Sequence, residues 1–248
     1  MLLIGQITAQ VLAKVAAQAK PGVTTDDLDR LAVSYAHQFQ AQSSCLNYHG
    51  FPKSICTSLN EVACHGIPSP HVKLQAGDIL NIDIALTKDG YHGDTSVMVF
   101  VGGKAACSPE AQHLVDVTQE CLFHGIAQVK PGASLYDIAH AIDAHATKNQ
   151  LYVVEQFCGH GIGRKLHEKP EILHYAPTEA SEIRYLKNFK IAEGMTFTIE
   201  PIINRGTKDV TVLADQWTVV TKDSSLSAQW EHTILVTDTG YKILTTLA

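Results

Sequence analysis

The sequence has 248 residues, of which 45% are hydrophobic and 18% are charged, so it can bury a sizeable core and is not a disordered chain. A net charge of −6 without a basic run argues against nucleic acid or an anionic membrane as the main partner. No apolar segment has bilayer length, the N-terminus lacks signal-peptide features, and the six cysteines show no CxxC spacing, so we expect reduced thiols and a cytoplasmic location.

Two helices joined by a turn are predicted for the first 40 residues. Apolar side chains recur at helical spacing between residues 4 and 15 and again between residues 28 and 39. A Pro-Gly pair between these segments ends the first helix. Thr24 and Asp27 have the spacing of a capping box, which predicts that the second helix begins after Thr24.

Residues 79–86 alternate between apolar and polar side chains and are predicted to form a strand. Period two places Asn81 and Asp83 on one face, opposite the aliphatic side chains. Asp94 precedes the apolar run of residues 97–101, so a second strand is expected to open at this carboxylate.

The second half of the chain repeats this order. Residues 20–27 and 130–137 both fit Lys-Pro-Gly-x-Ser/Thr-x-x-Asp, and a helix is predicted on either side of the second copy. A strand over residues 195–200 ends at Glu200, and Glu231 precedes the next apolar strand. Each half therefore contains a turn, a first carboxylate and a second carboxylate in the same order.

The repeated order predicts an α+β fold with pseudo-twofold symmetry, in which a curved, mainly antiparallel sheet is covered by helices. No linker or low-complexity segment separates the halves. We therefore expect a single domain over residues 1–248, with an internal repeat of roughly residues 1–104 and 105–248.

The symmetry is expected to bring Asp83, Asp94, Glu200 and Glu231 together where the halves meet. Four carboxylates cannot share a partly buried site as free anions, because repulsion and desolvation would protonate some of them. Divalent cations remove that conflict. With His160 as a nitrogen ligand, the set suits two adjacent first-row ions such as Mn, Fe(II), Co or Zn, rather than a structural zinc site, which prefers cysteines. Two such ions could activate a water and clamp a carbonyl oxygen.

Each of these carboxylates by itself has an ordinary explanation. A single aspartate in a strand is usually a solvated group near a turn. Asp94 follows a glycine and could occupy a plain turn, and Glu200 before Pro201 could simply end a strand. The metal interpretation therefore depends on the common order of the carboxylates in the two halves.

Seven segments of the chain resemble the methionine aminopeptidases of the bacterial type, which have the pita-bread fold. The segments together span nearly the whole chain, and only their combination is specific. They are NEVACHGIP (60–68), NID (81–83), HGDT (92–95), CGHGIG (158–163), HEKP (167–170), TIEP (198–201) and SAQWEHT (227–233).

The resemblance implies metal ligands that are divided between two divalent ions. Asp83 and Asp94 would bind one ion, and Asp94, His160, Glu200 and Glu231 would bind the other. Asp94 and Glu231 would bridge the two ions, with a hydroxide between them as the nucleophile.

The resemblance also implies catalytic and substrate-binding residues. His65 would contact the substrate amide, His167 would hydrogen-bond the scissile carbonyl and its oxyanion, and Glu200 could shuttle a proton. Soft and aromatic side chains suit a thioether, although each of them is equally compatible with an ordinary core. The methionine pocket would be lined by Cys45, Tyr48, Phe51, Cys56, Leu166 and Trp217.

The chain departs from the family pattern beside His167. Leu166 stands where phenylalanine is usual, Lys165 where glycine is common, and Phe51 where tyrosine is common. The smaller side chain at position 166 is expected to weaken methionine binding a few-fold. The charge of Lys165 is expected to disfavour a protonated His167, unless the lysine extends into solvent.

The activity that the resemblance implies is removal of the initiator methionine from nascent proteins with a small second residue. We expect the enzyme to be a monomer and to act at the ribosome. A specialised or weakly active duplicate, or an Xaa-Pro aminopeptidase or prolidase of the same fold, is the alternative enzyme. The last two usually carry an extra N-terminal domain. A non-catalytic binding module on this fold would lose metal ligands, whereas this sequence retains all five.

Overall fold

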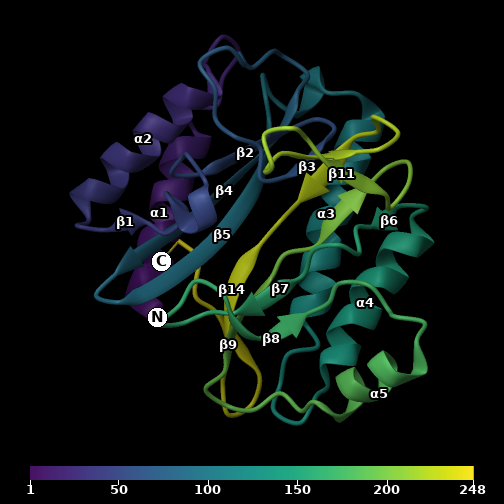
Figure 1. Ribbon diagram of the computed structural model, residues 1–248. Coiled ribbons are helices and arrows are strands. Elements are labelled where there is room, and N and C mark those ends of the chain that lie inside the picture. Colours follow the sequence, from purple (N-terminus) through teal and green to yellow (C-terminus); the bar gives the residue numbers. More distant parts are fainter. Residues whose placement is uncertain (248) are drawn as a thin grey trace.

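Helices cover antiparallel strand ladders in the computed structural model, which describes residues 1–247 (Figure 1). The α1–α2 pair lies on one side of the strands and the α3–α4 pair on the other (Figure 1). The helices are α1 (Leu2–Ala16), α2 (Thr25–Gln38), α3 (Pro109–Ile126), α4 (Leu135–Lys148) and α5 (Ala180–Asn188), with the short 3₁₀ helices η1 (Tyr48–Gly50) and η2 (Lys104–Ala106).

The strands belong to separate ladders, and every pairing among them is antiparallel within the described residues. They are β1 (Gln42–Ser43), β2 (Cys56–Leu59), β3 (Val62–Cys64), β4 (Ile79–Lys88), β5 (Tyr91–Phe100), β6 (Tyr152–Val153), β7 (Gly159–Gly161), β8 (Glu168–Ile172), β9 (Thr196–Ile199), β10 (Ile202–Asn204), β11 (Val210–Val212), β12 (Val219–Thr221), β13 (Ser227–Gln229), β14 (His232–Val236) and β15 (Tyr241–Ile243).

Each half begins with the predicted pair of helices. Between α1 and α2, the Thr24 hydroxyl accepts the Asp27 N–H at 3.1 Å, and the Asp27 carboxylate accepts the Thr24 N–H at 3.1 Å. Ser134 and Asp137 form the same reciprocal pair at the start of α4. Both predicted capping boxes are confirmed, and each satisfies two backbone donors at a helix N-terminus.

The two turns are also anchored to the following chain in the same way. The Gly22 N–H donates to the Leu74 carbonyl at 2.8 Å, and the Gly132 N–H donates to the Ile191 carbonyl at 2.9 Å. Both glycines have positive φ angles, of 91° and 86°, which a side chain would disfavour. The repeated sequence motif therefore has a repeated backbone role.

The first half contains the longest ladder. β4 and β5 pair along their whole length, and the aliphatic face of β4 packs against α1 and α2. Asn81 and Asp83 lie on the other face, as the alternation predicted. Asn81 donates to Ser96 of β5 at 3.1 Å and to the Gln229 carbonyl of β13 at 2.8 Å, so it links the two halves.

In the second half, β9 pairs with β14 on one side and with β7 on the other. Phe197 and Ile199 enter the core that α3 and α4 cover. Because His232 is paired with Ile199, the next residue beyond each, Glu200 after β9 and Glu231 before β14, emerges at the same end of the ladder.

One detail of the predicted sheet is wrong. β5 begins at Tyr91, so that Asp94 lies inside the strand instead of opening it. The pairing of β4 with β5 continues through polar residues up to the tight turn before Tyr91. Hydrophobic periodicity gives no signal for these polar residues. The halves meet where Ser96 and Glu231 exchange backbone hydrogen bonds of 3.4 and 3.3 Å.

Two further observations concern the chain as a whole. Within residues 1–247, no helix combines the length and the apolar character that crossing a bilayer requires. All six cysteines are unpaired and four of them are buried, as expected for reduced thiols.

Candidate active site

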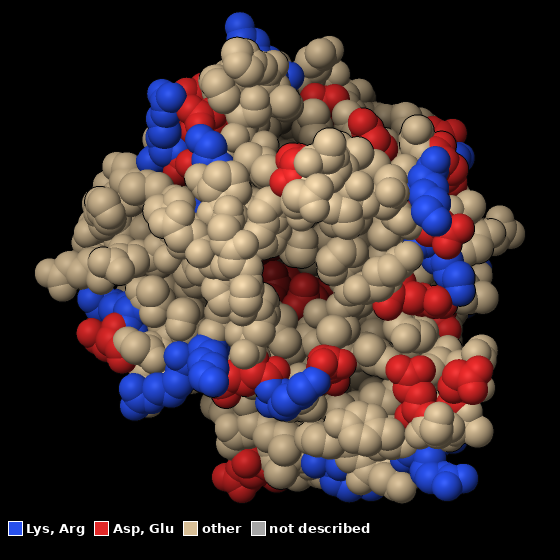
Figure 2. All heavy atoms as spheres, in the orientation of Figure 1, with Lys and Arg blue, Asp and Glu red and all other residues tan. Residues whose placement is uncertain are grey.

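A cavity of about 1110 Å³ opens between the two halves. Figure 2 shows it as a hollow with acidic side chains at its base. Every residue that the sequence singled out lines this cavity, although the residues come from segments throughout the chain: Cys45, Tyr48, Phe51, Cys56, His65, Asp83, Asp94, His160, Leu166, His167, Glu200, Trp217 and Glu231.

The base of the cavity is an acidic cluster, by which we mean Asp83, Asp94, Glu200 and Glu231 together with His160. Asp83 is on β4 and Asp94 is on β5, in adjacent strands of one ladder. Glu200 and Glu231 emerge from the β9–β14 end, and His160 is on β7, which also pairs with β9. Both halves thus supply carboxylates from paired strands, which hold the side chains in a fixed arrangement.

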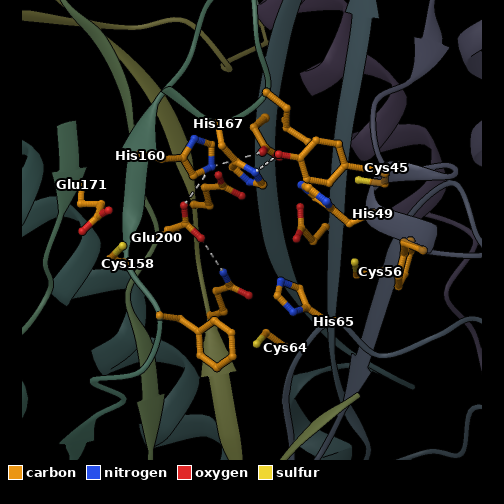
Figure 3. A pocket seen from close by; sticks show the side chains of 18 of the residues that line it. Cys45, His49, Cys56, Cys64, His65, Cys158, His160, His167, Glu171 and Glu200 are labelled. Atoms are coloured by element: carbon orange, nitrogen blue, oxygen red, sulfur yellow. Dashed lines mark hydrogen bonds and ion pairs between the residues drawn. The ribbon is translucent and has the colours of Figure 1, made fainter. Parts of the chain in front are cut away.

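The distances within the acidic cluster are those of groups that share a ligand. The Nε2 atom of His160 lies 3.5 Å from a Glu200 oxygen and 3.8 Å from an Asp94 oxygen (Figure 3). One ligand atom from each of Asp94, His160 and Glu231 lies within 4.8 Å of the others. This arrangement could hold a metal ion.

Burial raises the pKa of every carboxyl group in the acidic cluster. The pKa of Asp94 rises to about 7 and that of Glu200 to about 8. For Asp83 and Glu231, burial and the charges of the neighbouring carboxylates raise the pKa well above its usual range. Burial lowers the pKa of His160 to about 3, so its imidazole is neutral. In the metal-free protein these carboxyl groups therefore largely hold protons near pH 7, and divalent cations would replace those protons as the compensating charge.

Asp94 gives a direct test of whether the cluster fits a metal. Its side chain is buried, and its Oδ1 atom has no hydrogen-bond partner among the described residues. A buried carboxylate oxygen without a partner is costly. Coordination to a cation would satisfy this atom, and carboxylate and imidazole ligands together suit first-row divalent ions. The residues present therefore fit the predicted metal site.

Glu200 is held by residues that the sequence did not single out. The Thr198 hydroxyl donates to one of its oxygens at 2.7 Å, and the Gln229 amide donates to the other at 3.4 Å. The buried His174 accepts the backbone N–H of Glu200 at 3.1 Å, and burial lowers the pKa of His174 to about 3. Thr198 and Gln229 stand inside the quoted motifs and could have been found there, whereas His174 lies in none of them.

The two histidines outside the acidic cluster lie on different sides of the cavity (Figure 3). His65 is in edge contact with Phe157 and Trp217, at centroid distances of 5.4 and 6.2 Å, and burial lowers its pKa to about 4. Its backbone has a φ angle of 54°, a conformation that is costly for a residue with a side chain. His167 lies 4.2 Å from the ring of His160, centroid to centroid.

Comparison with known proteins identifies the family of this chain. The sequence model of metallopeptidase family M24 matches residues 1–238. The methionine aminopeptidase of Escherichia coli strain K12 is 48% identical over 246 residues, which are 99% of this chain and 89% of that protein. The chain belongs to the methionine aminopeptidase family. The predicted resemblance and the prediction of a metallo-aminopeptidase are confirmed at this level.

Solved structures confirm the predicted fold class. The methionine aminopeptidase from Rickettsia prowazekii superposes with a TM-score of 0.92 at 43% identity, over 99% of this chain and 95% of that one. The prolidase from Pyrococcus furiosus reaches a TM-score of 0.73 at 17% identity, and this chain covers 63% of it. The second likeness shows the shared fold alone.

Beside the acidic cluster, the cavity has an apolar wall, defined as Cys45, Tyr48, Phe51, Cys56, Leu166 and Trp217. Cys45, Tyr48 and Leu166 pack together, and Phe51 meets Trp217 edge to face at 5.2 Å. Burial raises the pKa of the Cys45 and Cys56 thiols well above the usual range, so both stay uncharged. The sequence missed Cys64 and Phe157, which also line the cavity and neighbour predicted residues in the chain.

Lys165 and Leu166, the departures from the family pattern, occupy different surroundings. Leu166 is buried in the wall, whereas Lys165 is exposed at the mouth, where its backbone N–H donates to Glu168 at 2.8 Å. The pKa of His167 is lowered by burial first and then by His49 and His92. The neutral His167 that was expected therefore has causes other than the charge of Lys165.

Proposed function

We propose that this chain removes the N-terminal methionine from proteins whose second residue is small. The observation that carries the proposal is that Asp94, His160 and Glu231, a group that could hold a metal ion, line the same cavity as an apolar wall. Membership of the methionine aminopeptidase family, over almost the full chain, supports the same activity.

Two divalent ions per chain are part of this proposal. Asp83 and Asp94 would hold one ion and Asp94, His160, Glu200 and Glu231 the other, with Asp94 and Glu231 shared. When bound, such ions supply Lewis-acid polarisation of the scissile carbonyl and lower the pKa of a water. The unpaired Oδ1 atom of Asp94 supports a ligand role for this residue, because coordination would satisfy an otherwise unpartnered buried oxygen. Mn, Fe(II), Co and Zn all suit this ligand set.

The side chains above the acidic cluster would act on the peptide itself. His167 would donate a hydrogen bond to the scissile carbonyl oxygen, where negative charge develops, and His65 would contact the amide. Glu200, which lines the cavity beside them, would accept and release a proton. The free amine of the substrate would be held beside the carboxylates, which excludes internal peptide bonds.

The apolar wall would receive the methionine side chain. Uncharged thiols and aromatic edges offer a polarisable surface to a thioether, and a sulfur–aromatic contact contributes about 0.3–1.5 kcal/mol. Trp217 and Phe51 stand in edge contact with each other, so the wall is already assembled before a substrate enters.

The proposal is tested by methionine release from Met-Ala-Ser with each of the four metals. We expect cleavage of Met-Ala-Ser, little cleavage of Met-Trp-Ser, and none of N-acetyl-Met-Ala-Ser. Ala-Pro serves as the control for an Xaa-Pro enzyme of the same fold. Equal cleavage of the acetylated peptide, or a preference for Ala-Pro, would refute the proposal.

We further propose that the substrates are nascent proteins reached at the ribosome, and that the enzyme acts as a monomer in the cytoplasm. The family and its substrates support the first part. Sedimentation of the purified chain with and without translating ribosomes tests both. A sedimentation coefficient of a dimer would contradict the monomeric state, and no binding to ribosomes would contradict action at the ribosome.

A further inference from the structure

The Tyr48 hydroxyl has one polar contact among residues 1–247, and that contact is with His167. Its hydroxyl oxygen lies 2.6 Å from Nδ1 of His167, although 119 residues separate the two in the chain. The rings also meet edge to face, with centroids 5.0 Å apart. This contact is more specific than a place in an apolar wall requires.

The direction of this hydrogen bond follows from what each atom can do. The Tyr48 hydroxyl has no other acceptor in reach among residues 1–247. A phenol is protonated near pH 7, and burial raises the pKa of Tyr48 further. The O–H can therefore donate to the lone pair of Nδ1 of His167. A neutral imidazole carries a proton on one nitrogen only, so this hydrogen bond requires the proton of His167 to be on Nε2.

The backbone around Tyr48 holds its ring in place. Asn47 and His49, on either side of it, have φ angles of 64° and 48°, which residues with side chains adopt rarely. The Tyr48 N–H donates to the Cys45 carbonyl at 2.9 Å, and the Phe51 N–H donates to the Tyr48 carbonyl at 3.0 Å. Strained conformations that the surroundings maintain are typical of positions that aim a functional group.

We propose that Tyr48 is a positioning residue that holds His167 in the tautomer with the proton on Nε2. This inference rests on the proposed function, in which His167 donates to the scissile carbonyl oxygen. Within the described residues, no protein group bonds to Nε2 of His167. With Nδ1 occupied by the hydroxyl, the nitrogen that meets a substrate in the cavity is a donor. The opposite tautomer would present a lone pair to the carbonyl oxygen and repel it.

The variant Tyr48→Phe separates this role from that of a wall residue, because phenylalanine keeps the ring and removes only the hydroxyl. We expect kcat on Met-Ala-Ser to fall roughly tenfold and KM to change by less than about twofold. The loss should be smaller than the 10²–10³-fold loss typical of removing a donor to an oxyanion. Tyr152→Phe, which removes a hydroxyl at an exposed position on β6, is the matched control and should leave both constants unchanged.

A double-mutant cycle tests whether Tyr48 acts through His167. In a His167→Gln background, Tyr48→Phe should change kcat by less than about twofold. A tenfold loss in both backgrounds, or wild-type kcat in Tyr48→Phe, would overturn the proposal.

Nitrogen-15 NMR of the histidine rings in the zinc-loaded protein gives a readout that is independent of activity. His167→Gln assigns the His167 signals. We expect Nε2 to be protonated and Nδ1 unprotonated in the wild-type chain, and a mixture of tautomers in Tyr48→Phe. A proton on Nδ1 in the wild type would overturn the proposal. Failure of the wild type to cleave methionyl peptides would instead contradict the proposed function, and the NMR result would still decide the assignment of Tyr48.

Discussion

The acidic cluster and the apolar wall share one cavity but are built differently. The cluster comes from paired strands of both halves: Asp83, Asp94 and His160 lie within strands, and Glu200 and Glu231 directly adjoin the paired ends of β9 and β14. The wall comes mostly from turns and short loops, among them the 3₁₀ helix η1 and the segment before β8. Fixed geometry is needed where charges must be compensated at defined distances, whereas an apolar surface tolerates variation in shape. Substitutions in the cluster should therefore lower kcat strongly, and those in the wall should change KM modestly.

Removal of metal should have the largest effect, because it leaves the acidic cluster without compensation for its carboxylates. We expect chelation to abolish peptidase activity, and Mn, Fe(II) or Co to restore it. The measurement is methionine release before chelation, after it, and after addition of each metal. Full activity in metal-free buffer would show that the cluster is not the catalytic part of the cavity.

Loss of a shared ligand should have the next largest effect. Asp94→Asn and Glu231→Gln should each lower kcat at least about a hundredfold, a loss typical of removing transition-state stabilisation. Both proteins should remain folded, because a neutral amide relieves repulsion in the metal-free site. Circular dichroism and metal content accompany the kinetics, and exposed Glu193→Gln is the control. Wild-type kinetics in either variant would contradict the shared-ligand role.

In the metal-free protein, repulsion among the carboxylates of the acidic cluster should make the free energy of unfolding depend on pH. The pKa of Glu200 is raised from its usual 4.5 to about 8 in the folded state. The stabilisation of the folded protein by protonated Glu200 is therefore fully present below about pH 4.5 and is lost as pH rises through 8. Glu200→Gln removes this dependence. We expect the metal-free variant and wild type to be similar at pH 5, and the variant to be more stable at pH 8.5 by on the order of a few kcal/mol.

Urea unfolding of both metal-free proteins at the two pH values measures this difference. The comparison between variant and wild type cancels the contributions of the buried histidines, whose lowered pKa values act in the opposite direction. A difference in stability that is the same at both pH values would mean that Glu200 is not held at a raised pKa.

A change in the apolar wall should have the smallest effect. Leu166→Phe, combined with Lys165→Gly, restores the residues usual in the family. We expect a few-fold lower KM for methionyl peptides and an almost unchanged kcat, because the new ring adds contact to a thioether without touching the cluster. Each single variant should be measured as a control. If the double variant is no better than the parent, these positions do not limit the enzyme.

Local sequence patterns determined the helices α1 to α4, the two capping boxes and the faces of the strands, whereas α5 was not predicted. Thr24 with Asp27, and Ser134 with Asp137, are three residues apart, and the alternation around Asp83 has period two, so neighbours in the chain decide these features. The repeated order of the carboxylates was enough to predict the acidic cluster. Candidate metal ligands could be proposed because each of them lies in a segment that resembles the family.

Only the tertiary structure decided which distant groups meet. His174 lies behind Glu200, and Tyr48 meets His167 across 119 residues, yet no periodicity or spacing marks either pair. The same holds for Asp94, which lies inside β5 because pairing with β4 extends past the apolar run. Contacts of this kind depend on how distant segments of the chain pack against one another, and packing is a property of the folded chain and not of a local segment.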